Sequence, residues 1–176
     1  FDLIGSAAST IQESRVGVIA TPSTVRTKAY TNAILEFKPK TFVIEQPCPE
    51  FVPMIEMGNI SSGEITDVAN TYLKPLLKHK IHSLILGCSH YPLISPVLTE
   101  ILPSSVKLID PADALSLKLS LFVNSKAGNI SKKNKLLNLK IYVTSNLKNF
   151  PNKVERWLNV LPEVNLVSLQ KKGWVS

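Results

Sequence analysis

A cysteine and a histidine lie two residues apart directly after a short apolar run, and they are the residues best suited to chemistry. The run 83–86 is followed by Gly87, Cys88, Ser89 and His90. Such a run predicts a buried strand, and in open α/β sheets ligands bind beyond the carboxyl ends of the strands. The helical pattern that follows places the amides of Ser89 and His90 near a helix N-terminus, which favours an anion. A thiol beside an anion site predicts proton or acyl transfer on a carboxylated substrate.

Both residues have a structural alternative to a role in chemistry. As an imidazolium, His90 is expected to lower the pKa of the thiol and to support a carboxylate or a developing enolate. Alternatively, His90 only caps the start of the following helix. Free cysteine is among the most buried residue types, so Cys88 taken alone is equally a small core residue. Cys88 and His90 could supply only two of the ligands of a zinc ion, and the sequence has no second pair at ligand spacing. No metal is therefore expected.

Strand and helix patterns alternate along the chain and position this segment in an α/β fold. Short apolar or β-branched runs predict strands, and apolar residues at helical spacing predict helices. We expect strands at 1–4, 16–21, 41–45, 83–86, 106–109, 141–144 and 164–168, helices at 24–35, 63–77, 95–102, 112–122 and 153–160, and a lysine-rich loop at 124–138. Strands separated by helices of this length predict right-handed crossovers and a parallel sheet.

The composition is that of an ordinary globular protein and excludes several classes of function. Of 176 residues, 44% are hydrophobic and 19% charged, and no run approaches the roughly 18 apolar residues of a membrane span. The net charge of +7 is concentrated from Asp113 onward. No aromatic series accompanies those lysines, so we expect a solvated surface and no nucleic-acid partner.

Two cysteines in unrelated contexts indicate a reducing, cytosolic compartment.

Four segments together resemble the bacterial glutamate racemases, and they occur in that family's order. Residues 86–93 (LGCSHYPL) are similar to the family's second-cysteine motif LGCTHYPLL. Residues 16–25 with Tyr30 are similar to VGVIGTxxTVxSxxY, and 47–56 (PCPEFVPMIE) to CPLFVPLVE. Residues 108–111 (LIDP) resemble the strand and turn that leave the domain. The resemblance covers residues 1–112 well and the remainder loosely.

The resemblance implies a cofactor-independent racemisation of L-glutamate to D-glutamate, which supplies D-glutamate for peptidoglycan. Two cysteines on opposite faces of the substrate carry out this reaction: the thiolate of one removes the α-proton, and the thiol of the other donates a proton to the opposite face. Glutamate is then the expected small-molecule partner. Whether the longer protein forms a homodimer stays an open question. Two alternatives also stay open: an aspartate racemase, and a non-catalytic α/β binding module whose cysteine is structural.

The resemblance also implies roles for individual residues. Cys88 is one of the two catalytic cysteines, and Glu56 matches the glutamate that helps to poise the base. Thr21 and Thr24 follow the first predicted strand at a spacing of three, which suits either carboxylate binding or an ordinary helix N-cap. Ser89 stands where the family has threonine, so its hydroxyl is retained for carboxylate binding. His90 is expected both to assist catalysis and to bind substrate.

Cys48 is the other cysteine and is expected to be structural. It lies between Pro47 and Pro49, directly after a predicted strand, and prolines on both sides restrict the backbone. The family has a cysteine at this position and does not use it as the racemising base. No disulfide with Cys88 is expected, because the two follow different strands and the compartment is reducing.

The family's first-cysteine segment, with its DSGxGG turn and ACNTAS loop, has no counterpart here, and the chain opens with Phe1. We therefore expect a C-terminal fragment that is inactive alone. The expected domains are 1–13, a remnant of the first domain and linker; 14–112, a complete parallel-sheet three-layer α/β domain with Cys88; and 113–176, the C-terminal part of the first domain, similar in fold.

Overall fold

The computed structural model describes residues 2–126, 140–145, 150–158 and 161–168. The chain divides into two compact units, residues 1–128 and 129–176, which are described separately. Among the described residues, no helix has both the length and the apolar character that a membrane crossing requires. The expected assignment of 113–176 to a second, incomplete domain stays a prediction.

A four-stranded parallel sheet forms the centre of the first unit, as the alternating pattern predicted. Its strands are β1 (Arg15–Ala20), β2 (Phe42–Pro47), β3 (Ser83–Leu86) and β4 (Lys107–Ile109), in the order β2-β1-β3-β4. Val16 of β1 pairs with Val43 on one side and with Ser83 on the other. Because all four strands run in one direction, their carboxyl ends meet at one edge of the sheet, where a site is expected.

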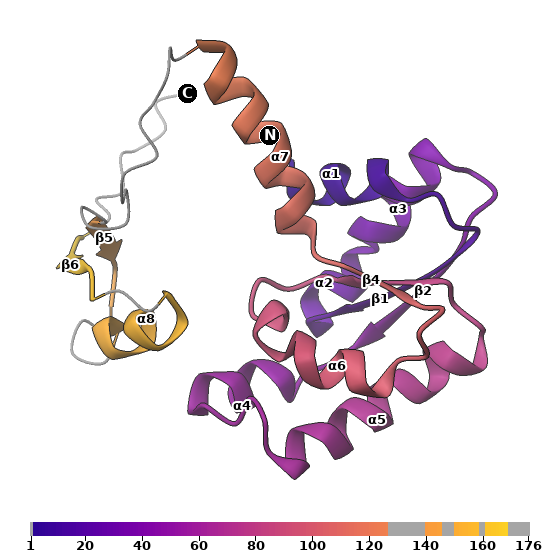
Figure 1. Ribbon diagram of the computed structural model, residues 1–176, viewed down its shortest axis with the longest axis horizontal. Helices are drawn as coiled ribbons and strands as arrows, with labels where there is room; N and C mark the ends of the chain where they lie inside the picture. Colours follow the sequence, from indigo (N-terminus) through magenta and orange to yellow (C-terminus); the bar gives the residue numbers. More distant parts are fainter. Residues whose placement is uncertain (1, 127–139, 146–149, 159–160, 169–176) are drawn as a thin grey trace, which may run out of the picture. The chain divides into compact units, whose positions relative to one another are not determined.

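Helices cover both faces of this sheet and complete a three-layer domain (Figure 1). They are α1 (Leu3–Thr10), α2 (Pro22–Thr27), α3 (Ala29–Phe37), α4 (Phe51–Met57), α5 (Gly63–Lys78), α6 (Ser95–Ile101) and the short 3₁₀ helix η1 (Tyr91–Ile94). A further helix, α7 (Pro111–Lys126), packs against α1. Val16 and Val18 belong to the core cluster beneath α1 and α3, whereas Ile19 belongs to the cluster beneath α4, α5 and α6. Successive side chains of β1 point to opposite faces of the sheet, so the strand contributes residues to both core clusters.

The described residues of the second unit form two further strands and one helix. Strand β5 (Lys140–Val143) pairs in parallel with β6 (Glu163–Leu166), and α8 (Phe150–Leu158) lies between them in the sequence. These elements correspond to the three predicted there. Of the predicted loop 124–138, residues 124–126 belong to α7, and the rest lies outside the described residues.

The strand predicted at 1–4 is wrong, because α1 begins at Leu3. The carboxylate of Asp2 accepts hydrogen bonds from the backbone nitrogens of Ile4 (3.0 Å) and Gly5 (2.9 Å). An aspartate in this position satisfies the free amides of a first helical turn. The apolar residues at 3–4 therefore open a helix; Phe1 lies outside the described residues.

Two other helical segments differ from the prediction. The helix expected at 24–35 is broken at Lys28, whose φ of 51° is left-handed and separates α2 from α3. Helix α4 was not predicted at all, since Pro53 interrupts its short apolar sequence. The sequence does carry a stop signal for it: Gly58 has φ 89° and ends the helix as a C-terminal glycine typically does.

Candidate active site

Gly87 connects β3 to the candidate site and has no room for a side chain. Its backbone nitrogen donates to the carbonyl of Ile19 at 2.7 Å, which continues the pairing of β1 and β3 by one residue. A Cβ on Gly87 would lie 2.8 Å from that carbonyl oxygen and 2.9 Å from the Cβ of Ala20. The close approach requires glycine and holds Cys88 at the carboxyl edge of the sheet.

Cys88, His90 and Glu56 form a continuous chain of polar contacts. The Sγ of Cys88 lies 3.9 Å from Nδ1 of His90, and Nε2 of His90 lies 3.0 Å from Oε1 of Glu56. The side chains of His90 and Glu56 are 26% and 32% exposed. A nucleophile or acid, a base and an orienting carboxylate in this order can move a proton to and from the thiol. The structure thus brings together three of the residues predicted from the sequence.

The electrostatic surroundings of Cys88 act in two directions. Burial raises the pKa of the Cys88 thiol above its ordinary value, and the backbone amides of His90 and Tyr91 partly offset this by favouring the thiolate. The net rise is opposite to the lowering that a neighbouring imidazolium was expected to produce. A partly buried thiol of this kind is predominantly protonated at neutral pH, which suits the role of proton donor.

A cavity of about 220 Å³ lies beside Cys88. It is lined by Leu3, Tyr30, Leu86, Gly87, Cys88, Ser89, Pro92, Asp110, Pro111 and Ala112. Tyr30 and Asp110 were not predicted as site residues, although both lie within the quoted motifs. Burial raises the pKa of Tyr30 to about 12, so its phenol stays protonated and can donate a hydrogen bond. Ser89, predicted to bind a carboxylate, lies on the wall of this cavity.

Thr21 and Thr24 form a separate polar pair after β1. Their hydroxyl oxygens lie 3.0 Å apart, and Thr21 Oγ1 accepts a 3.4 Å hydrogen bond from the backbone nitrogen of Thr24. Thr21 is thus the N-cap of α2, which is the structural alternative considered for it. Because Thr21 follows β1 directly, the pair lies at the same edge of the sheet as Cys88. It does not line the cavity beside Cys88.

Cys48 is fully buried in the core. Its Sγ donates to the carbonyl of Gln46 at 3.5 Å, and its own carbonyl accepts a 3.1 Å hydrogen bond from the hydroxyl of Tyr91. Burial strongly raises the pKa of the Cys48 thiol. These contacts support a structural role. Both cysteines are free thiols, and the described residues contain no group of three or more potential metal ligands.

No protein-family model matches the chain. Its sequence is nevertheless similar to those of glutamate racemases. The glutamate racemase of Prochlorococcus marinus (strain NATL2A) is 80% identical over all 176 residues, and the chain spans 66% of its length. The glutamate racemase of Synechococcus sp. (strain CC9605) is 40% identical over 166 residues, and the match covers 63% of it. The chain therefore spans slightly less than two thirds of the length of these relatives.

Solved structures show the same fold. Glutamate racemase from Francisella tularensis, in complex with D-glutamate, has a TM-score of 0.82 and 36% identity, covering 95% of this chain and 63% of that one. Glutamate racemase isoform RacE1 from Bacillus anthracis has a TM-score of 0.81 and 28% identity, with the same coverage. These likenesses confirm the racemase-type α/β fold expected from the sequence. With this fold and 80% identity along its whole length to one of these enzymes, the chain belongs to the glutamate racemase family.

Proposed function

We propose that this chain provides one half of the site at which L-glutamate and D-glutamate are interconverted without a cofactor. The observation that carries the proposal is the contact chain from Cys88 through His90 to Glu56 at the carboxyl edge of the sheet. It is supported by the likeness to the Francisella tularensis racemase, which was solved with D-glutamate. The family membership makes glutamate the first substrate to test, ahead of aspartate.

In the proposed reaction, a thiolate removes the α-proton of glutamate and a thiol on the other face returns one. The bond that breaks is the Cα–H bond, and its electron pair is held as an enolate of the substrate carboxylate until the second proton arrives. Cys88, predominantly protonated, acts as the donor in one direction. In the reverse direction it passes its proton toward Nδ1 of His90 and acts as the base.

The remaining residues have supporting roles in the proposal. Glu56 holds His90, and the hydroxyl of Ser89 binds a substrate carboxylate at the cavity wall. Thr21 and Thr24 bind substrate at the same edge of the sheet. The second cysteine comes from outside these 176 residues, because Cys48 is fully buried. We further propose that the product supplies peptidoglycan synthesis in the cytoplasm and that the longer protein forms a homodimer.

The experiment that tests the proposal is ligand protection of Cys88 from alkylation. The chain is treated with iodoacetamide at mildly alkaline pH, and modification of Cys88 is followed by mass spectrometry with and without D-glutamate or L-glutamate. Both enantiomers should slow the modification, whereas Cys48 should stay unmodified throughout. The Cys88→Ser variant identifies the labelled site.

Three outcomes separate the candidate functions. Protection by both glutamate enantiomers and not by aspartate supports the proposal. Protection by aspartate alone indicates an aspartate racemase. Alkylation of Cys88 at the same rate with every amino acid contradicts a substrate site and favours the binding module with a structural cysteine.

A further inference from the structure

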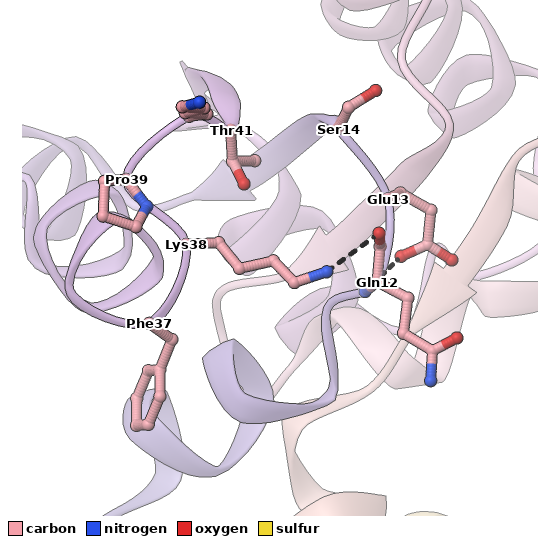
Figure 2. Close-up of a pocket in the computed structure, with 8 residues that line it drawn as sticks. Gln12, Glu13, Ser14, Phe37, Lys38, Pro39 and Thr41 are labelled. Atoms are coloured by element: carbon pink, nitrogen blue, oxygen red, sulfur yellow. Dashed lines mark hydrogen bonds between the residues drawn. The ribbon is translucent and has the colours of Figure 1, made fainter.

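A second and larger cavity lies at the opposite end of the sheet. Its volume is about 440 Å³, and it lies between the segment 12–14, which precedes β1, and the segment 37–41, which precedes β2 (Figure 2). We call it the amino-end cavity. Parallel strands place their amino ends together, and β1 has six residues at about 3.3 Å each. Roughly 20 Å of strand therefore separates this cavity from the edge that carries Cys88.

The lining of the amino-end cavity combines apolar surface with positive charge. It contains Gln12, Glu13, Ser14, Phe37, Lys38, Pro39, Lys40 and Thr41. The ring of Phe37 is 56% exposed although it borders a concave surface. Figure 2 shows the side chain of Lys38 extending across to Gln12, with Phe37 on one side of it and Thr41 on the other. Its Nζ donates to the carbonyl of Gln12 at 3.0 Å.

The charges of this cavity are not compensated. Lys38 is bound to a backbone carbonyl, and Oε2 of Glu13 accepts from the backbone nitrogen of Gln12 at 3.0 Å. Within the described part of the chain, neither Lys38 nor Lys40 forms an ion pair with a carboxylate. The lining therefore includes two lysines and one glutamate, and this net positive charge favours an anionic ligand.

Thr41 provides an independent indication of a ligand. The residue is only 8% exposed, and its hydroxyl makes no hydrogen bond to any described residue. Figure 2 shows this hydroxyl directed into the space between the two segments. The hydroxyl oxygen is not among the fully buried unpartnered atoms of the described residues, so it keeps accessible surface and is free to bond a ligand atom.

We propose that the amino-end cavity binds a small aromatic carboxylate. The ring of the ligand packs against Phe37 and Pro39, and its carboxylate binds the ammonium group of Lys40 and the hydroxyl of Thr41. The volume lies within the range of small-molecule sites, about 300–1,000 Å³, and an apolar lining with a few polar groups is typical of them. The site is distinct from that of the proposed reaction, and glutamate, which has no apolar ring, is not its ligand.

Heteronuclear NMR of the isotopically labelled chain tests the proposal, with 3-phenylpropionate as the probe. Its amide, 3-phenylpropionamide, controls for charge, and butyrate controls for the ring. We expect saturable shifts confined to the amides of 12–14 and 37–42, and much weaker binding of both controls. D-Glutamate should not displace the probe.

Two variants and a matched control locate the binding groups. Lys40→Gln should weaken binding about fivefold, the size expected for one exposed ion pair. Thr41→Val, which keeps the shape of the side chain, should weaken it about threefold. Lys74→Gln removes the same charge from the exposed surface of α5 and should leave binding unchanged. Equal binding of the acid and its amide, shifts spread over the whole chain, or unchanged affinity in both variants would overturn the proposal.

Discussion

Nε2 of His90 lies 3.0 Å from Oε1 of Glu56, a residue 34 positions earlier in the chain. In a neutral imidazole, a ring nitrogen that donates to a carboxylate leaves the other nitrogen as an acceptor, and Nδ1 is the one that faces Cys88. Glu56 is therefore placed to position His90, through which it can act on the thiol. The short 3₁₀ helix η1 follows His90 directly, and α4, which carries Glu56, packs against η1.

Removing Glu56 should slow the alkylation of Cys88. In Glu56→Ala, the imidazole loses the carboxylate that orients it, so we expect the rate at mildly alkaline pH to fall about three- to tenfold. Iodoacetamide labelling followed by mass spectrometry measures the rate. Glu50→Ala is the matched control, because Glu50 accepts a hydrogen bond from Tyr72 (2.7 Å). If Cys88 is alkylated at the same rate in Glu56→Ala as in Glu50→Ala, Glu56 has no influence on the thiol.

The Thr21–Thr24 pair should contribute to ligand binding. Thr24→Val removes a hydroxyl at the carboxyl edge of the sheet and preserves the shape of the side chain. The concentration of D-glutamate that half-protects Cys88 should rise about threefold. Thr27→Val controls for the substitution, since the Thr27 hydroxyl only donates to the backbone carbonyl of Thr24. If D-glutamate half-protects Cys88 at the same concentration in Thr24→Val as in Thr27→Val, the Thr21–Thr24 pair is only a helix cap.

Gly87→Ala should destabilise the fold, whereas Gly63→Ala should not. The new Cβ at position 87 meets the carbonyl of Ile19 at 2.8 Å and the ring of Tyr30 at 3.0 Å, so backbone must move. We expect a loss of about 1–3 kcal/mol in the free energy of unfolding, measured with urea. At Gly63, in the first turn of α5, no atom lies within 4 Å, so the substitution should be neutral or slightly stabilising. An unchanged urea midpoint in Gly87→Ala would contradict the tight packing at the strand end.

The buried thiol of Cys48 should make the fold less stable as the pH rises. Burial raises its pKa, so the folded chain keeps a proton that the unfolded chain releases above its pKa of about 8.5. The unfolded state then binds fewer protons, and the free energy of unfolding falls by up to about 1.4 kcal/mol per pH unit. Urea unfolding between about pH 7.5 and pH 9.5 measures this slope. The slope should be shallower in Cys48→Ala, and an identical slope would exclude Cys48 as its cause.

The chain alone should not racemise glutamate. A two-base reaction needs a group on each face of the substrate, and of the two cysteines only Cys88 lies at the cavity. Incubation with L-glutamate in deuterated water should therefore yield no deuterated D-glutamate above background, measured by chiral chromatography with mass detection. Clear formation that is absent in Cys88→Ser would refute both this argument and the structural role of Cys48.

Local sequence patterns predicted the sheet and missed features that depend on neighbouring residues. The strand 83–86 was predicted with the bounds that the structure has, because a short apolar run followed by glycine has few other conformations. The break at Lys28 was not predicted, since a left-handed lysine leaves no mark in the pattern of apolar residues. The strand predicted at 1–4 failed because the N-cap by Asp2 was overlooked.

The sequence by itself determined which residues are placed at the carboxyl edge of the sheet. Parallel strands share that edge, so the positions of Thr21 and Cys88 follow from the strands that precede them. Only the tertiary structure decided that Glu56 reaches His90 and that Tyr30 and Asp110 line the cavity of Cys88. The reason is physical: a strand follows from local periodicity, whereas these contacts depend on how helices far apart in the sequence pack against the sheet.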